Sequence, residues 1–237
     1  MRSKRKLDFN RSRHYLDGTK TPHLAEDSRE DVNLPAGFSR RKVSKVQAKS
    51  MAYNARKAAQ TIAFFAMKNG ALPLAVIKAV KLVYLADRES VRRFGFPIQD
   101  EDRVSMKHGP VNSETYAMIN GEADPVASGW SDFLRDREDH NLALARPDLS
   151  EDDLDELSDA DIEALNAVWE RFGHMTKWQL RDWTHVQANV PEWEDPGSSS
   201  SLIPMTRMMA HLNVPNVDAQ AATVRDFDRI DSLFKAL

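Results

Sequence analysis

Hydrophobic residues recur at helical spacing in the first ordered part of the chain. Over residues 54–68, alanine, isoleucine and phenylalanine lie three and four positions apart, and an Asn-Gly stop signal follows at 69–70. The next run, residues 72–94, is apolar nearly all round until Asp87. We therefore predict two helices, of which the second starts at Pro73 and lies in the middle of the core.

Short extended segments follow these helices. Residues 103–107 alternate in polarity and predict a short strand that Gly109-Pro110 ends. Pro110 suits the first turn of a helix, so a third helix is predicted over residues 110–119. Residues 141–145 (NLALA) also alternate, and we expect them to pair with 103–107. Two short strands need a helical layer to be stable, so this ribbon should pack on the helices.

The C-terminal half is also amphipathic. Helices are predicted over residues 158–173 and 175–186, followed by a flexible Pro- and Ser-rich loop at 191–201 and by one or two helices over 203–234. The pattern indicates a mainly α (α+β) fold. It would be a compact multi-helix domain, residues 51–237, around a buried central helix, with a small two- or three-stranded antiparallel β-ribbon.

The first fifty residues differ from the rest of the chain. They contain 13 Lys and Arg against 6 Asp and Glu, whereas residues 51–237 contain 20 against 30. Their few large apolar residues show no period, which predicts a disordered basic tail. Such a tail is either a solvated extension or an arm attracted to nucleic acid or to an acidic protein surface. A third alternative is that translation starts at Met51.

Composition removes several classes of protein. Hydrophobic residues make up 41% and charged residues 29%, as in ordinary soluble proteins. The chain has no cysteine, which excludes disulfides, thiolate metal sites and cysteine nucleophiles. No stretch approaches the roughly 18 apolar residues of a membrane span. We expect a cytoplasmic protein without a membrane partner.

An acidic stretch lies between the two halves. Residues 148–163 hold nine acidic residues and no basic one. Ser150 and Ser158 each precede acidic residues, as at helix N-termini. The stretch is therefore interpreted as a solvated helix start, and its alternative is a docking site for a basic partner.

A search for catalytic motifs finds little. The seven histidines show no metal-binding spacing, and the chain has no phosphate-binding glycine loop and no nucleophile elbow. We expect no metal, no cofactor and no enzymatic activity. The best acid–base pair would be His185 with Glu192, the candidate site of a hydrolase. Its alternative, a histidine that fixes a turn by bonding backbone, is the interpretation that we favour.

Several motifs occur in an order that resembles one family. They are KLVYLAD at 81–87, GFPI at 95–98 and MKHGPV at 106–111, followed by the Leu157-Ser158…Asp161 helix start and by WTH at 183–185 with PEW at 191–193. Together they resemble the Panacea domain of SocA-like antitoxins, over roughly residues 51–212. The basic tail departs from a minimal member of that family.

The resemblance implies a function without catalysis. Such a protein neutralises a cognate toxin by direct binding, or delivers the toxin as an adaptor to a cytosolic AAA+ protease. The second helix, the HGPV motif and the acidic stretch are the candidate contact regions. The candidate partner-binding residues are Lys81, Tyr84, Asp87, His108, Gly109, Pro110, His185 and Trp193.

The matched residues also have physical interpretations. Lys81 and Asp87 are polar on an apolar helix and need hydrogen-bonding partners if they are buried. The HGPV motif predicts a strand-to-helix corner that is either architecture or, through its free N–H groups, a site for an acidic group. Trp193 behind Pro191 is either an anchor that closes the last loop or a contact residue.

A different function would use the tail. A nucleic-acid-binding regulator could track phosphates with residues 1–50, and its binding would weaken steeply with salt. The negative charge of residues 51–237 argues against DNA docking on the folded part.

Overall fold

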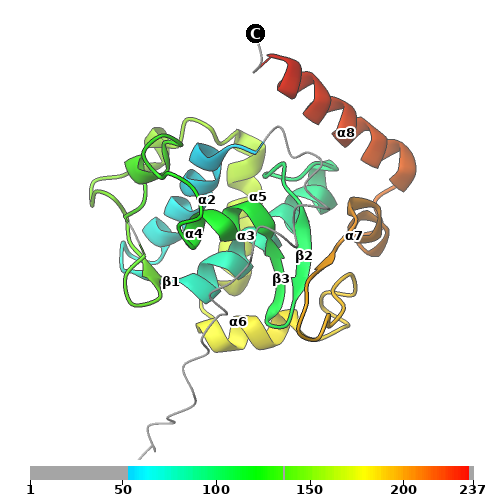
Figure 1. Ribbon diagram of the computed structural model, residues 1–237, viewed down its shortest axis with the longest axis horizontal. Helices are drawn as coiled ribbons and strands as arrows, with labels where there is room; N and C mark the ends of the chain where they lie inside the picture. The colour runs from blue at the N-terminus through cyan, green and yellow to red at the C-terminus, as the bar shows by residue number, and fades with distance from the viewer. Residues whose placement is uncertain (1–52, 136, 235–237) are drawn as a thin grey trace, which may run out of the picture. The chain divides into compact units, whose positions relative to one another are not determined.

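The computed structural model describes residues 53–135 and 137–234, all within one unit, Gln47–Leu237. The predicted basic tail lies outside the described residues. The described part is mainly α-helical, with two small antiparallel sheets, as the sequence predicts (Figure 1). The larger helices are α2 (Ala55–Lys68), α3 (Val76–Phe94), α5 (Asp159–Phe172), α6 (Lys177–Thr184) and α8 (Val217–Phe234).

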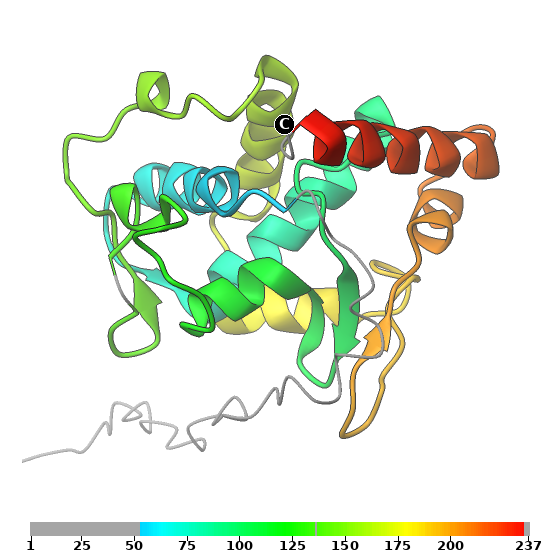
Figure 2. The ribbon, with the colours of Figure 1, turned by 45° about the horizontal axis from the view of Figure 1, so that its top comes forward.

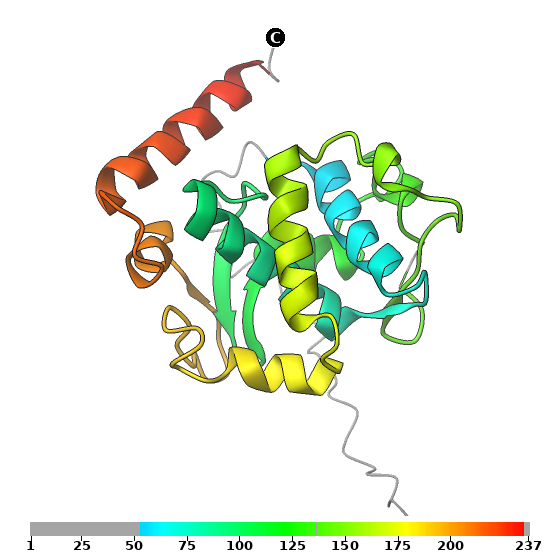
Figure 3. The same ribbon diagram turned by 180° about the vertical axis from the view of Figure 1, so that it is seen from behind.

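Helix α3 is the buried centre. It contacts α2, α5, α6 and the β-hairpin, and most of its residues up to Asp87 are buried. Seen from behind, α2 and α5 run side by side across it, and α6 lies at the end of α5 (Figure 3). Gly95, at φ 79°, ends the helix in the left-handed conformation that glycine adopts without strain.

The predicted start of α3 is wrong by a few residues. Leu74–Ala75 form strand β1, which pairs with strand β4 (Asn141–Leu142). The N–H of Val76 donates to the carbonyl of His140, so tertiary hydrogen bonds hold the chain extended and delay the first helical turn. The predicted pairing of residues 141–145 with 103–107 is wrong for the same reason, since β1 occupies β4.

A β-hairpin replaces the predicted strand-to-helix corner. Strands β2 (Arg103–Met106) and β3 (Gly109–Asn112) pair antiparallel, and α4 starts only at Ser113 (Ser113–Ile119). Strand β5 (Ser201–Leu202) pairs with the other side of β2. Pro110 therefore lies on an edge strand, where its missing N–H disturbs no ladder. A helix starting at Pro110 is thus wrong, and so is a helix N-terminus there for an acidic group.

Two helix starts follow the sequence signals closely. Ser158 and Thr176 cap α5 and α6, and each forms a reciprocal capping box with the residue three positions on. Within the acidic stretch, Asp161 completes the α5 box and pairs with Lys57 at 2.9 Å, while Asp153 accepts a hydrogen bond from the backbone N–H of Ser150. The stretch thus starts helical turns, as favoured, and several of its carboxylates are already engaged inside the domain.

The chain ends with α7 (Met205–His211) and α8. Figure 2 shows α7 between β5 and α8, and α8 near the end of α3. Ala221 and Val224 of α8 are buried, and Gln220 donates to the carbonyl of Gly95 at 3.0 Å. Farther along, Phe227 contacts Phe96, but the apolar residues beyond it are exposed.

Candidate functional site

The candidate site begins with Lys81, in the buried middle of α3. Its Nζ donates to the carbonyl of Pro110 at 2.8 Å, which joins the KLVYLAD and HGPV motifs directly. The side chain is nearly inaccessible, and burial lowers the pKa of Lys81 to about 7 because an ammonium ion loses its hydration there. At neutral pH a substantial fraction of this amine is uncharged.

Gly109 lies against this amine in the turn of the hairpin. Its φ is +90°, which L side chains rarely adopt. A Cβ added at this position would lie 2.9 Å from Lys81 Nζ and 3.1 Å from both His185 Cε1 and Thr184 Oγ1. The turn, α3 and the end of α6 therefore meet at a point where only glycine fits.

His185 fixes the end of α6 to this turn. Nδ1 lies 2.7 Å from the carbonyl of Arg181, and Nε2 lies 3.1 Å from the carbonyl of Lys107. Its ring makes an edge contact with Trp193, whose Nε1 donates to the carbonyl of Met106 at 3.1 Å. Both rings therefore bond hairpin backbone. Trp193 is buried and serves as the anchor that the sequence predicts.

We name this assembly the hairpin corner, and it comprises Lys81, Lys107–Pro110, Thr184, His185 and Trp193. His108 lies at its surface and is partly exposed. Burial, helped by the neighbouring charges of Lys107, His185, Lys81 and Arg181, lowers the pKa of His108. The corner thus has a buried amine beneath a surface of basic residues.

Tyr84 leads to a second buried connection. Its hydroxyl donates to Glu192 Oε1 at 2.9 Å, and Arg88 Nε donates to the same oxygen at 2.7 Å. Glu192 is fully buried, so these two donors compensate for the hydration that its carboxylate has lost. Burial, and next the charge of Glu192, raise the pKa of Tyr84. Glu192 therefore bonds to side chains of α3, and no hydrogen bond or ion pair joins it to His185 within the described residues. The acid–base pair that a hydrolase would need has no geometric support.

Asp87 is the centre of a third connection. Oδ1 accepts from the backbone N–H groups of Ile98 and Gln99, at 3.1 and 3.0 Å. Oδ2 accepts from Arg103 Nη2 at 2.7 Å and from Asn112 Nδ2 at 2.8 Å. One carboxylate thus holds the GFPI turn and both hairpin strands against α3, which satisfies the partner requirement predicted for Asp87.

Glu101 extends this connection towards α4. It accepts from the N–H of Thr115 at 2.7 Å, from Thr115 Oγ1 at 2.5 Å and from Asn112 Nδ2 at 3.1 Å. Burial raises the pKa of Glu101 to about 8. Sequence reasoning missed Arg88, Arg103 and Glu101. Arg103 alone left a signal, because a charged residue stands at an inward position of an alternating strand.

The predicted partner-binding residues thus lie at different depths. Six of them are buried, and their polar groups bond other parts of the domain; these are Lys81, Tyr84, Asp87, Gly109, Pro110 and Trp193. His108 and His185 keep exposed atoms. The outer side of α6 adds Trp178, 39% exposed, with Lys177 and Arg181 over its ring. Of the predicted partner-binding residues, only the two histidines are therefore accessible to a partner. The outer side of α6, which lies outside the quoted motifs, is accessible beside them.

Neither a metal site nor a membrane-spanning helix is found in the part of the chain that the structure describes. Across the described ranges, no group of three or more histidine and acidic residues could hold a metal ion. Of the helices described, none combines the length and apolar character needed to cross a membrane.

Comparison with known proteins gives one match. Residues 80–194, from α3 to the loop that holds Glu192 and Trp193, match the family described as antitoxin SocA-like, Panacea domain. Neither a curated protein nor a solved structure matches the chain. The matched range includes all three buried connections.

Proposed function

We propose, from the match of residues 80–194 to the SocA-like antitoxin family with its Panacea domain, that the chain neutralises a cognate protein toxin by binding it directly. The family match is the observation that carries the proposal. The match implies an antitoxin with a toxin partner in general. Direct binding is the simplest mechanism for a domain in which the polar groups of Lys81, Asp87 and Glu192 face inward.

The geometry supports binding rather than catalysis. The amine of Lys81 and the carboxylates of Asp87 and Glu192 are buried and bonded within the domain. A reactive group needs access to a substrate, and these three groups have almost none. We therefore propose that they build a rigid scaffold and that no catalytic step is involved.

The proposed contact face is the surface of the hairpin corner with the outer side of α6. It presents His108, His185 and Trp178 next to several basic side chains. Tryptophan and arginine are enriched among the residues that dominate binding energy. A stable complex would bury roughly 1,200–2,000 Å², so the contact would extend beyond this face.

The test is co-expression with the product of the neighbouring gene. We expect that product to arrest growth when expressed alone, and this chain to relieve the arrest and to co-purify with it. As a control, Asp87→Ala should abolish relief together with the soluble chain, because it removes the carboxylate that bonds three segments. A neighbour that is not toxic, or relief without a complex, would contradict the proposal.

Delivery to a protease is a separate step that we propose to test in the same cells. An adaptor shortens the half-life of the bound toxin, whereas an antitoxin that only covers the toxin leaves it intact. We propose a cytosolic AAA+ protease as the further partner. A toxin half-life that does not change with this chain would remove that partner and leave direct binding standing.

The charge of residues 1–50 favours a second candidate function. With seven more basic than acidic residues, this segment would neutralise phosphates, and a nucleic-acid-binding regulator is the alternative. DNA binding should weaken steeply with salt and should be lost on deletion of residues 1–50. Binding that survives this deletion would contradict the alternative.

A further inference from the structure

A groove lies between α3, α5 and α6, apart from the hairpin corner. Its volume is about 470 Å³, and Leu212, just after α7, lines it as well. Its apolar lining includes Leu85 of α3, Val168 and Phe172 of α5, and Trp183 of α6. Trp183 meets Phe172 edge to face, with ring centroids 4.7 Å apart. These side chains form a floor that could accept one apolar side chain of a ligand.

The rim of the groove is basic. Four arginines and two glutamates line it, a surplus of two positive charges on a domain whose net charge is strongly negative. The arginines are Arg88, Arg92, Arg93 and Arg171. Because the rest of the domain repels acidic molecules, this rim is a place where an acidic segment would be held preferentially.

The arginines differ in how far they are already neutralised. Arg88 is paired with buried Glu192, Arg92 with Glu89, and Arg93 with both Glu89 and Glu163. Arg171 is exposed and has no ion pair within the described ranges; its guanidinium lies 5.0 Å from the ring centre of Phe172 and 5.4 Å from that of Trp183. Stacking on aromatic faces leaves the in-plane N–H groups of an arginine free to bind a carboxylate.

The charges select one kind of occupant. The basic segment 1–50 of this chain would be repelled by the rim, since it carries seven more positive than negative charges. A carboxylate-rich segment would be attracted, and the floor requires that it also carry an apolar residue. An amphipathic helix that lays its apolar face into a groove meets both requirements.

We propose that this groove binds an acidic amphipathic segment of a partner polypeptide, with an apolar side chain on the Phe172–Trp183 floor and a carboxylate on Arg171. The identification of this partner as the toxin rests on the proposed function. The preference of the groove for an acidic amphipathic segment is independent of that function. The lining of the groove includes neither His108 nor His185, and so the groove adds a second contact to the face proposed above.

The experiment measures binding to the purified full chain by calorimetry. The probes are the neighbouring gene product and a synthetic helical peptide with leucines at helical spacing among glutamates. A second peptide carries lysines in place of the glutamates. We expect the acidic peptide to bind and the lysine peptide not to bind.

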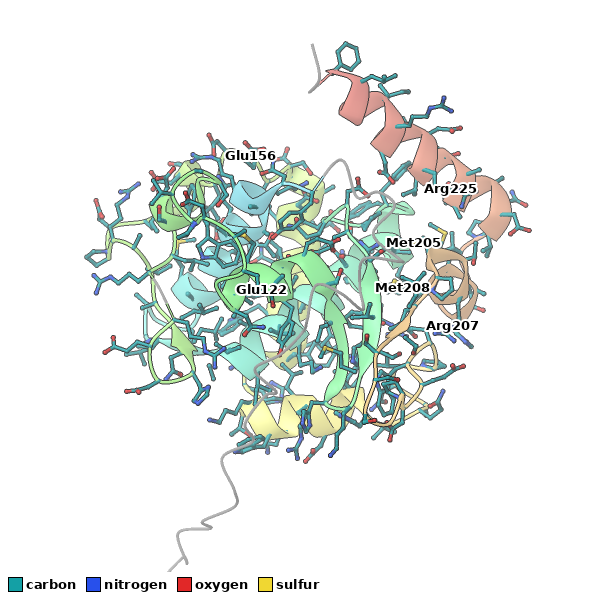
Figure 4. All side chains as sticks on the ribbon, viewed as in Figure 1. Glu122, Glu156, Met205, Arg207, Met208 and Arg225 are labelled. Atoms are coloured by element: carbon teal, nitrogen blue, oxygen red, sulfur yellow. The ribbon has the colours of Figure 1, made fainter. Side chains whose placement is uncertain are left out.

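The variants locate the site. Arg171→Glu should weaken the binding of both the gene product and the acidic peptide at least about tenfold, because it turns attraction into repulsion. Arg171→Lys should keep most of the binding. Arg225→Glu is the matched control: Arg225 is exposed on α8, outside the groove lining, and reversing it should leave binding unchanged (Figure 4). Thermal melts establish that each variant is folded.

The outcomes separate this proposal from the proposed function. If the gene product binds equally to the Arg171→Glu variant, the groove proposal is overturned and the antitoxin function stands. If the gene product does not bind at all but the acidic peptide binds through Arg171, the antitoxin function fails and the groove stands. Failure of the acidic peptide, equal binding of both peptides, or an Arg171-dependent dimer of this chain would each overturn the groove proposal.

Discussion

Asp87 and Lys81 are both buried on α3, yet the protein treats their charges differently. Asp87 accepts hydrogen bonds from two backbone N–H groups, from Arg103 and from Asn112. Lys81 donates to one carbonyl, that of Pro110, and its pKa is lowered to about 7. Burial lowers the pKa of a lysine that has few hydrogen-bonding partners, because its ammonium form loses hydration. We conclude that the connection at Asp87 is fixed, whereas the connection at Lys81 is sensitive to protonation.

The largest effect on stability should come from removing the carboxylate of Asp87, which has more hydrogen-bonding partners than the amine of Lys81. Asp87→Ala leaves Arg103 as an unpaired buried cation and should lower the free energy of unfolding by about 3–5 kcal/mol. Chemical denaturation measures the change. The control is Asp152→Ala, at an exposed aspartate, which should change it by less than about 0.5 kcal/mol. Equal losses would show that the Asp87 connection contributes nothing particular.

A smaller loss of stability is expected from substitutions in the hairpin turn, where Gly109 lies against Lys81. Gly109→Ala and Gly121→Ala both place a side chain at positive φ, which costs about 1–2 kcal/mol. At Gly109 the new methyl group also meets Lys81, His185 and Thr184, whereas at Gly121 nothing lies within 4 Å. Thermal melts should therefore show a clearly larger loss for Gly109→Ala. Equal losses would mean that the corner relaxes without cost.

The third effect concerns the hydroxyl of Tyr84, which lies between Lys81 and Asp87 on α3. Tyr84→Phe removes one of the donors to buried Glu192 and should cost about 1–3 kcal/mol in the free energy of unfolding. Tyr116→Phe is the matched control and should be nearly neutral, because the hydroxyl of this buried tyrosine has no hydrogen-bonding partner in the part of the chain that the structure describes. If both substitutions were neutral, Arg88 alone would suffice to hold Glu192.

The smallest effect, when measured over a single pH unit, is a dependence of stability on pH. Because the pKa of Lys81 is lower in the folded state than in the unfolded chain, the unfolded chain binds the extra proton between about pH 7 and 10.5. Lys81 should therefore make the protein more stable as pH rises through this range, by at most about 1.4 kcal/mol per pH unit. Denaturation of Lys81→Met should lack this rise. The same slope in the variant would contradict the lowered pKa.

Much of the fold could be predicted from local signals. The capping residues Ser158 and Thr176 start helices where the sequence places them, and Gly95 ends α3. The errors fall where a tertiary contact decides between two local structures. Pro110 suits a helix start and an edge strand equally, and only pairing with Ser105 selects the strand.

The site was less predictable than the fold. The spacing of Lys81, Tyr84 and Asp87 shows that they share one side of a helix, but not that they meet three different segments. Glu192 was recognised beside Trp193, yet its partners are about a hundred residues away, and nothing in the local pattern indicates them. Such pairings depend on the packing of α3 against loops far away in sequence.

The most direct test of the central claim is the affinity of folded Tyr84→Phe for the neighbouring gene product that we propose as the toxin. Tyr84 lies in the interior of the domain, whereas the partner is proposed to bind at the surface. We therefore predict that the variant loses stability but binds within about twofold of the unsubstituted chain, a change of roughly 0.4 kcal/mol. A folded variant that binds tenfold more weakly would show that this residue itself recognises the partner, and would contradict the account.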